Sequence, residues 1–397
     1  MTLIPITRDE EIEGPRMHAF VIGVGAYPDA KAGRGSLSEL RAVDDLPSAA
    51  DSAKLVCRWL LDNKDNFIAK LSSLEVLISD PADATSRYGW NPGPPIDGAT
   101  SEHVKQAGAD WLDRVSARPG DVAFFYCCGH GAVYGGQPIL FLEDLNTGKI
   151  EPWAHLNLGA LAQSLRRMPG LGCAFMFSDA CGEFVTKLEL SDARDSRFYM
   201  PPNLFEPTRN NVSFLCAASE AQLAHDATSL GFEGVSDDGS GVRFGRFTQT
   251  ILKGLQGSSS RWSKAGWVVD PISLYQDLRK LKQTFFRDWK EKPFEPFCPV
   301  TPNDFFPIIR HMQAEIPLVV MTDPEARIVD YDLHICPSNE HQAAIIQSRQ
   351  QRSPEAWRLL VPVSRDALYA VAVNNAARYA TPFIPSQPMF DHVVTVT

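Results

Sequence analysis

Short, almost continuously apolar runs recur along the first two-thirds of the chain, at residues 18–25, 74–78, 121–128, 172–178 and 212–217. Because apolar and polar residues do not alternate in them, these runs predict strands covered on both faces, as in a mostly parallel sheet. Segments with apolar residues at helical spacing lie between and after them, at 46–61, 100–117, 154–167, 246–254 and 271–289. Strands separated by helices predict an α/β fold with helices flanking a central sheet.

The pattern changes beyond about residue 313, where short apolar runs follow one another without strong helices between most of them. We therefore expect an N-terminal segment at 1–16, an α/β domain at 17–312, and a smaller β-rich C-terminal unit of sandwich type at 313–397. Residues 183–211 are charged and contain two adjacent prolines, which predicts a long exposed loop between the fourth and fifth strands.

Two of the predicted strands end in residues with catalytic chemistry. The third ends in the sequence CGHG, which contains His130, and the fourth ends in SDACG, which contains Cys181. Chemistry in such sheets collects at the carboxyl ends of the strands, so both side chains share one edge if these strands are neighbours. A thiolate is a strong nucleophile and an imidazole accepts its proton. The amides of Gly131 and Cys181 are candidate donors to an oxyanion.

Other interpretations of these motifs are weaker. The chain has eight cysteines, each of which is by default a small buried hydrophobe. Cys127 and Cys128 lie just before the candidate histidine, but no second cluster has metal-ligand spacing, so we expect them in the core and expect no metal site. Gly23 and Gly25 end the first strand as in a dinucleotide-binding loop, but Pro28 stands where that motif has its third glycine.

With their order along the chain, these motifs resemble the caspase–metacaspase–paracaspase superfamily of cysteine peptidases, and within it the prokaryotic metacaspase-like proteases. His130 precedes Cys181 by 51 residues, and caspases carry their histidine about 50 residues before a Q-A-C-[RQG]-G motif. The stretch DACGE matches this motif at its three middle positions and departs from it at Asp179 and Glu183. The stretches HAFVIGVGAY, LPSAADSAKLVCRWL, AASEAQLAHD and GRFTQTIL also resemble the family, so that the resemblance covers residues 17–256.

The resemblance implies a caspase-like sandwich and a His130/Cys181 endopeptidase that needs no metal or organic cofactor. Some metacaspases need calcium for activation, but the sequence does not indicate a calcium site. Caspases cut after Asp and have a cationic first specificity pocket (S1), whereas metacaspases and paracaspases cut after Arg or Lys and have an acidic one. Asp51, Asp179 and Asp226 match the acidic positions of that pocket. Because carboxylates hold a guanidinium by charge-assisted hydrogen bonds, we expect cleavage after Arg and, less readily, after Lys.

Activation and partners are expected from the same resemblance. Family members are often cut in the loop after the nucleophile, where Arg194 and Arg197 are candidate processing sites. We expect a zymogen that acts on protein substrates in signalling or defence, is switched by an activating protease or a regulatory partner, and is a monomer. The alternatives are a pseudoprotease scaffold that binds through its C-terminal unit, a protease that cuts after Asp, and a separase- or CHAT-like relative activated by a partner.

The composition of the chain bears on whether it binds nucleic acid or a membrane and on its location in the cell. The formal net charge of -10 disfavours nucleic acid as the main partner, because neutralising phosphates requires a basic surface. No run approaches 18 apolar residues, and the N-terminus lacks the pattern of a signal peptide. We therefore expect no membrane span, a cytoplasmic location and reduced cysteines.

Overall fold

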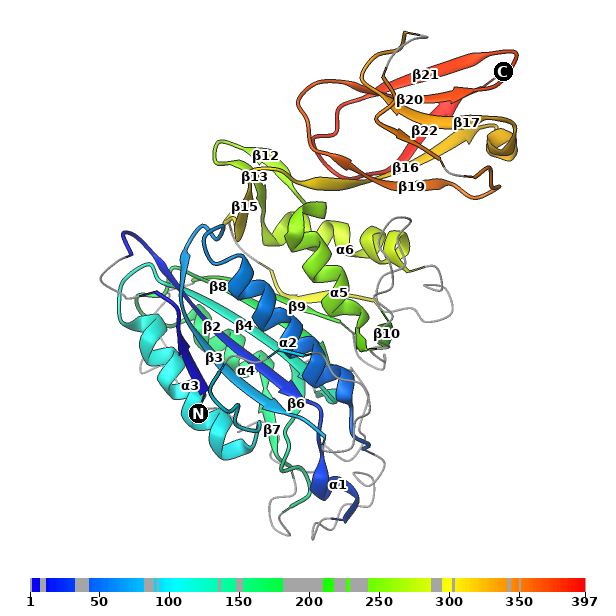
Figure 1. The fold of residues 1–397 in the computed structure, drawn as a ribbon. Coiled ribbons are helices and arrows are strands. Elements are labelled where there is room, and N and C mark those ends of the chain that lie inside the picture. Colours follow the sequence, from blue (N-terminus) through cyan, green and yellow to red (C-terminus); the bar gives the residue numbers. More distant parts are fainter. Residues whose placement is uncertain are drawn as a thin grey trace.

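The computed structural model describes residues 2–7, 12–32, 43–81, 89–90, 93–134, 137–147, 153–180, 210–217, 226–228, 242–286, 295–301, 304–340, 344–349 and 351–396. Within these ranges the central sheet has seven strands in the order β1-β3-β2-β4-β8-β9-β14 (Figure 1). They are β1 (Thr2–Pro5), β2 (Arg16–Val24), β3 (Lys70–Ser79), β4 (Val122–Gly129), β8 (Cys173–Ala180), β9 (Asn211–Cys216) and β14 (Phe297–Val300). The five inner strands are parallel and the two edge strands antiparallel, which confirms the expected mostly parallel sheet.

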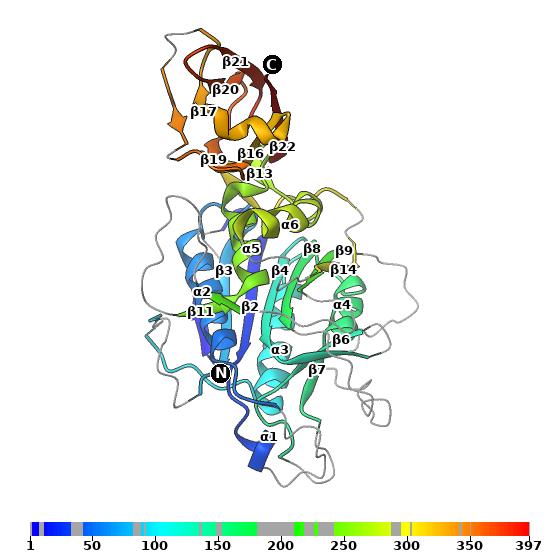
Figure 2. The same cartoon turned by 90° about the vertical axis from the view of Figure 1, so that its right-hand side faces the viewer.

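Helices cover both faces of this sheet, as the apolar strands require. On one face, α2 (Pro47–Asp62), α5 (Arg246–Lys253) and α6 (Pro271–Phe285) share a buried cluster with Phe124 and Phe177 of the strands. On the other face, α3 (Ser101–Ser116) and α4 (Leu158–Arg166) share a cluster with Phe20 and Phe125. Figure 2 shows α2 and α5 on one side of the strands and α4 on the other.

The helix boundaries follow local capping chemistry. The Thr100 hydroxyl accepts from the amide of His103 at 3.3 Å and begins α3 at the expected place. The helix expected over 154–167 begins later, at Leu158, because residues 155–157 form a short strand and the Asn157 side chain caps the helix. The last helix ends at Phe285, short of the expected residue 289, and residues 287–290 lie outside the described residues.

Smaller elements surround the ends of the central sheet. In the described residues, β5 (Gly131–Tyr134), β6 (Gln137–Phe141) and β7 (His155–Asn157) form one small sheet, and β10 (Asp226–Thr228) pairs with β11 (Arg243–Gly245). A third contains β12 (Arg261–Ser263), β13 (Gly266–Val269) and β15 (Ile309–His311). The short helix α1 (Pro28–Ala32) follows β2, and the π-helix η4 (Gly254–Ser258) continues α5.

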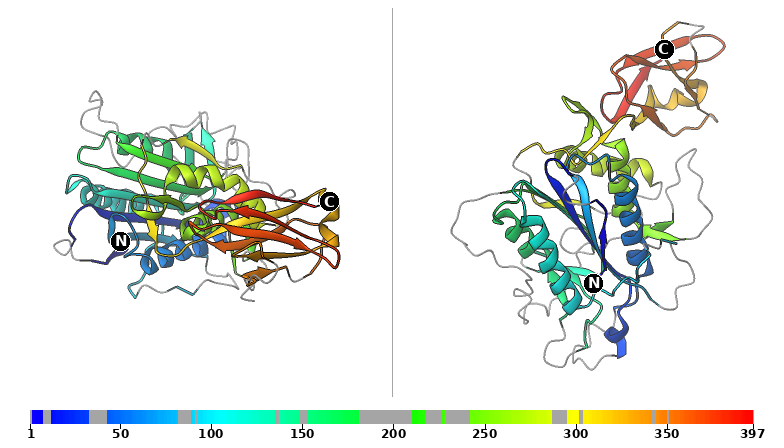
Figure 3. Two further views of the ribbon diagram at one scale, coloured as in Figure 1. Left: turned by 90° about the horizontal axis from the view of Figure 1, so that it is seen from above. Right: turned by 60° about the vertical axis from the view of Figure 1, so that its left-hand side comes forward.

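The C-terminal unit consists of two small sheets around one apolar core (Figure 3). One sheet contains β16 (Glu315–Asp323), β19 (Trp357–Pro362) and β22 (Met389–Thr395). The other contains β17 (Asp332–Cys336), β18 (Gln347–Ser348), β20 (Leu368–Val373) and β21 (Arg378–Phe383), and a short 3-10 helix (Glu325–Asp330) joins the two sheets. Strands therefore do predominate beyond residue 313, while the division of the chain into domains stays a prediction.

The chain enters the C-terminal unit from the amino-terminal edge of the central sheet. Just before β3 begins, Phe67 forms a β-bridge with Ile309, and the Arg310 amide donates to the Asn66 carbonyl at 2.9 Å. Beyond this point an ion pair joins Lys280 of α6 to Asp391 of β22 at 3.0 Å. Figure 1 shows the two C-terminal sheets at this end of the molecule, and the carboxyl end of β2 at the opposite end.

Candidate active site

The two strands that carry the predicted dyad are neighbours in the central sheet. Strand β4 pairs with β8 in parallel register, and the last pair of this ladder joins Gly129 to Ala180. His130 follows Gly129, and Cys181 follows Ala180 in the sequence. Cys181 lies outside the described residues, as does the loop that contains the predicted processing residues Arg194 and Arg197. What the structure describes is therefore the histidine and the strand that leads to the cysteine.

Hydrogen bonds define the tautomer of His130. Its Nε2 lies 2.9 Å from the carbonyl oxygen of Asp44, in the segment that precedes α2. A carbonyl oxygen only accepts, so Nε2 carries the proton in this bond and donates it. In the neutral ring the other nitrogen, Nδ1, then has a lone pair and can accept a proton. This is the state that a general base requires.

Tyr27 fixes the backbone and ring of the histidine. Its hydroxyl accepts from the His130 amide at 2.8 Å, and the two ring centroids are 5.1 Å apart. The Tyr27 amide donates to a carboxylate oxygen of Asp45 at 2.8 Å, which anchors the turn after β2. Gly129 is needed beside it, because a β-carbon there would lie 2.9 Å from the Tyr27 hydroxyl. Gly129, the first glycine of the CGHG motif, thus makes room for Tyr27, whose hydroxyl binds the His130 amide.

The register of the β5–β6 hairpin orients the amide of Gly131. The Phe141 amide donates to the His130 carbonyl at 2.9 Å, which sets these two residues at a hydrogen-bonding position of the ladder, although the His130 amide donates to Tyr27. Hydrogen-bonded and non-bonded pairs alternate in an antiparallel ladder, and Gly131 pairs with Leu140 at the next position. The Gly131 amide is therefore directed away from β6 rather than into the hairpin.

Of the three acids predicted from the sequence, Asp179 lies against Gly245 at the start of α5, whereas Asp226 and Asp51 are related to that glycine only through a strand pairing and a neighbouring residue. The carboxylate of Asp179 occupies the space that a β-carbon on Gly245 would fill. Asp226 is the partner of Gly245 in the β10–β11 ladder, although its side chain is outside the described features. Asp51 precedes Ser52, whose hydroxyl accepts from the Gly245 amide at 2.9 Å. Residues from four separated segments thus meet at this turn.

Asp179 is held by the first turn of α5. It is 3% exposed, and its Oδ2 accepts from the Thr248 amide at 2.9 Å and from the Thr248 hydroxyl. The Tyr126 hydroxyl lies 2.5 Å from the same threonine oxygen. Burial, followed by the nearby Cys128 and Asp179, raises the pKa of Tyr126 well above its usual value, so this hydroxyl stays protonated.

Asp51 is equally buried, at 1% exposure, near the start of α2. One of its oxygens lies 3.5 Å from the Lys54 ammonium, which binds Asp80 more closely, at 2.6 Å. Lys54 is therefore a buried cation beside two carboxylates at the carboxyl edge of the sheet. Sequence reasoning did not single it out, nor Ser52, Tyr27, Gly245 and Thr248, although all five lie in stretches that resemble the family.

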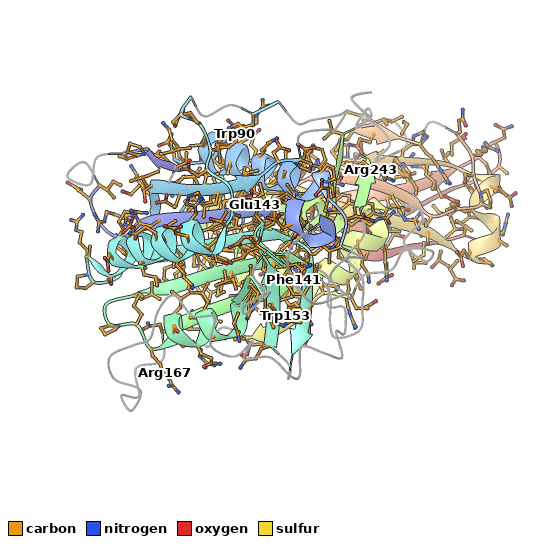
Figure 4. The ribbon with its side chains drawn as sticks, turned by 90° about the horizontal axis from the view of Figure 1, so that it is seen from below. Trp90, Phe141, Glu143, Trp153, Arg167 and Arg243 are labelled. Atoms are coloured by element: carbon orange, nitrogen blue, oxygen red, sulfur yellow. The ribbon has the colours of Figure 1, made fainter. Side chains whose placement is uncertain are left out.

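A further carboxylate at this edge, Glu143, has a structural role. Figure 4 looks onto this end of the molecule and labels Glu143, Phe141 and Trp153. Glu143 accepts from the Ser79 hydroxyl at 2.7 Å, at the end of β3, and its carboxylate fills the space beside Gly98. Phe141 and Trp153 pack with their ring centroids 6.3 Å apart. Glu143 therefore ties β6 to β3 rather than standing as an additional acid for catalysis.

Cys127, Cys128 and Gly23, which belong to the weaker interpretations of the sequence, have packing roles. Cys127 and Cys128 are 0% and 3% exposed, as expected of core residues. Burial raises the pKa of Cys127 to about 12, so it stays a thiol at neutral pH and is a poor nucleophile or metal ligand. A β-carbon on Gly23 would lie 2.5 Å from the Ala53 β-carbon, so this glycine lets α2 approach the sheet. Within the described ranges, no three His, Cys, Asp or Glu side chains gather as a metal site would require.

Comparison with protein-family models finds no model that matches the chain, and comparison with curated proteins finds no significant match. In the part of the chain that the structure describes, no helix has the length and apolar composition needed to cross a membrane.

Proposed function

We propose that this protein is a cysteine endopeptidase of the caspase-like kind, which cuts after Arg and, less readily, after Lys. The observation that carries the proposal is the parallel pairing of β4 with β8, which ends at Gly129 and Ala180. Consecutive Cα atoms are about 3.8 Å apart, and from this we infer that the residues that follow these two begin at the same edge of the sheet. They are His130 and Cys181, and an imidazole beside a thiol is the arrangement that activates a cysteine nucleophile.

The proposed reaction is acyl transfer through a thioester. His130 Nδ1 accepts the thiol proton, and the Cys181 sulfur attacks the carbonyl carbon of the substrate. The amides of Gly131 and Cys181 donate to the oxyanion that forms. The C–N bond breaks as His130 returns its proton to the leaving amine, and water then hydrolyses the thioester with His130 as base. These steps need no metal or organic cofactor.

Specificity for a basic residue is supported by the carboxylate of Asp179 against Gly245 and by the pairing of Asp226 with Gly245 in the β10–β11 ladder, with Asp51 assigned from the sequence resemblance. A guanidinium binds carboxylates through charge-assisted and often bidentate hydrogen bonds, which favours Arg over Lys. An acidic substrate residue would place like charges together in a buried site, which costs several kcal/mol. For this reason we favour Arg over Asp as the residue before the cut.

The remaining expectations from the sequence belong to the same proposal. They are a zymogen state, processing at Arg194 or Arg197, action on proteins in signalling or defence, a regulatory partner, a monomeric state and a cytoplasmic location. The C-terminal unit is attached at the amino-terminal edge of the sheet, away from the carboxyl edge where His130 lies. That position is less suited to blocking the site than to binding a partner.

An affinity label tests the proposal directly. A peptide that ends in Arg and carries an acyloxymethyl ketone forms a thioether with a cysteine activated in this way. Intact mass and peptide mapping should find one adduct, on Cys181, and none in the Cys181→Ala variant. A matched probe that ends in Asp should label far more slowly. An adduct on Cys298, the partly exposed cysteine, or equal labelling by the Asp probe would contradict the proposal.

A further inference from the structure

The turn at the start of α5 joins three buried elements by hydrogen bonds. Thr248, which is 0% exposed, donates its amide and its hydroxyl to Asp179 of β8. Tyr126 of β4 reaches the same hydroxyl oxygen at 2.5 Å, and Ser52 of α2 accepts from the Gly245 amide at 2.9 Å. These partners lie between 69 and 193 residues apart in the chain. The turn therefore fixes the strand that leads to Cys181 relative to α2, which carries Asp51.

The direction of each hydrogen bond that links Asp179, Thr248 and Tyr126 is determined. An ionised carboxylate only accepts, so the single hydroxyl proton of Thr248 goes to Asp179. The Thr248 oxygen then accepts from Tyr126, whose hydroxyl has a strongly raised pKa and keeps its proton. The Thr248 hydroxyl therefore donates one hydrogen bond and accepts another, which fixes its orientation. One Asp179 oxygen accepts from both the amide and the hydroxyl of Thr248. A side chain held in this way is pre-organised for binding.

We propose that Thr248 is a positioning residue that sets the preference for a basic substrate residue, by holding the Asp179 carboxylate ionised and correctly oriented. This inference rests on the proposed peptidase function. The Thr248 amide and hydroxyl and the positive end of the α5 dipole place partial positive charge beside Asp179, which stabilises the charged form of the carboxylate.

Gly245 also lies against the same carboxylate oxygen. A β-carbon at this position would overlap the Asp179 carboxylate, whereas the glycine backbone lies against it. The Gly245 amide is taken by Ser52, which keeps the turn in place. Asp179 thus contacts both Gly245 and Thr248, which fixes the position of its Oδ2 atom. Orientation is what a bidentate guanidinium contact requires, since its two parallel bonds tolerate little displacement.

A purely structural role for Thr248 makes a different prediction. Asp179 also caps α5, because it accepts from the third amide of the helix, and the loss of a cap lowers stability by itself. A cap alone would change the activity towards all substrates together. A positioning role changes the ratio of activities between a charged substrate residue and a neutral one of the same shape. The ratio is therefore the quantity to measure.

The test compares kcat/KM for two peptides that differ only in Arg or its neutral isostere citrulline before the cut. Thr248→Val should lower the Arg/citrulline ratio by roughly ten- to hundredfold, since it removes a hydrogen bond to a charged group. Thr248→Ser, which keeps the hydroxyl, should stay within about threefold of the wild-type ratio. Thr250→Val is the matched control, because the Thr250 hydroxyl is buried in the same helix but donates to the Arg246 carbonyl.

The outcomes distinguish a failure of the Thr248 inference from a failure of the peptidase proposal. An unchanged ratio in Thr248→Val, with lower activity on both peptides, would overturn the inference and leave the peptidase proposal intact. A wild-type protein that cleaves neither peptide and takes no Arg-directed label on Cys181 would overturn both. If Thr248→Val does not fold, Tyr126→Phe replaces it, since it removes the donor to Thr248, together with a contact to Cys128, and leaves Thr248 itself in place. A ratio reduced at least threefold then supports the inference, and an unchanged ratio overturns it.

Discussion

The backbone of Gly245 lies so close to the carboxylate of Asp179 that a β-carbon would overlap it, although Gly245 itself has an ordinary φ of -58°. The glycine is therefore required by this contact and not by its own backbone conformation. Gly245→Ala should displace Asp179 and lower kcat/KM for Arg substrates at least tenfold, with a loss of stability of about 1–3 kcal/mol from overpacking. Steady-state kinetics and urea unfolding measure the two effects.

A matched glycine gives the control for this substitution. Gly89 is exposed, and a β-carbon there has no heavy atom within 4 Å. Gly89→Ala should leave both activity and stability unchanged within error. Full activity of Gly245→Ala towards Arg peptides would argue against Asp179 as a specificity residue.

Tyr27 offers a second test, of the histidine side of the site. Tyr27→Phe removes the hydroxyl that accepts from the His130 amide and keeps the ring beside the imidazole. An amide left without its acceptor costs about 1–3 kcal/mol. We expect kcat to fall by roughly ten- to hundredfold with KM nearly unchanged, because the substitution affects the acid–base group and not the pocket. A change confined to KM would contradict this role.

The sheet and the strand ends were predictable because each depends on a local pattern. Continuous apolar runs predicted all five parallel strands, and the sequences CGHG and SDACG marked the ends of two of them. The meeting of Asp179 with Gly245 and Thr248 was not predictable, since it joins residues 66 to 69 positions apart that no periodicity relates. The strand at 155–157 was missed for a similar reason, because its partner β6 decides its conformation.

At the amino-terminal ends of the parallel strands, Asp121 should contribute to the stability of the fold and not to catalysis. Its carboxylate accepts from the Arg16 amide and Nε, each at 2.9 Å, and both side chains are almost fully buried. Asp121→Ala removes a buried carboxylate from the Arg16 guanidinium and should cost about 3–5 kcal/mol in urea unfolding. Asp62→Ala breaks the exposed pair with Arg58 and should cost at most about 1 kcal/mol. Similar losses in both variants would contradict this account of the buried pair.

Acid should destabilise the C-terminal unit through one buried and two half-buried histidines. Burial lowers the pKa of His392, and also of His334 and of His311 at the base of the unit. A histidine whose folded pKa is lowered stabilises the fold above its unfolded pKa of about 6.5, and this stability is lost as the pH falls through the folded pKa. The urea concentration at which half of the protein is unfolded should therefore be lower at pH 5.5 than at pH 7.5. His392→Gln should reduce that fall; a fall of the same size would show that His392 does not contribute.

The most direct test of the central claim is cleavage of fluorogenic peptides that end in Arg, Lys or Asp, by the wild-type protein and by Cys181→Ala, with calcium present or chelated. We predict cleavage after Arg, slower cleavage after Lys, none after Asp, and no cleavage by Cys181→Ala. Cleavage after Asp would retain a protease and reject Asp51, Asp179 and Asp226 as its specificity acids. Arg cleavage that persists in Cys181→Ala, or no cleavage of any peptide by a protein that also takes no label on Cys181, would contradict the assignment of a His130/Cys181 peptidase.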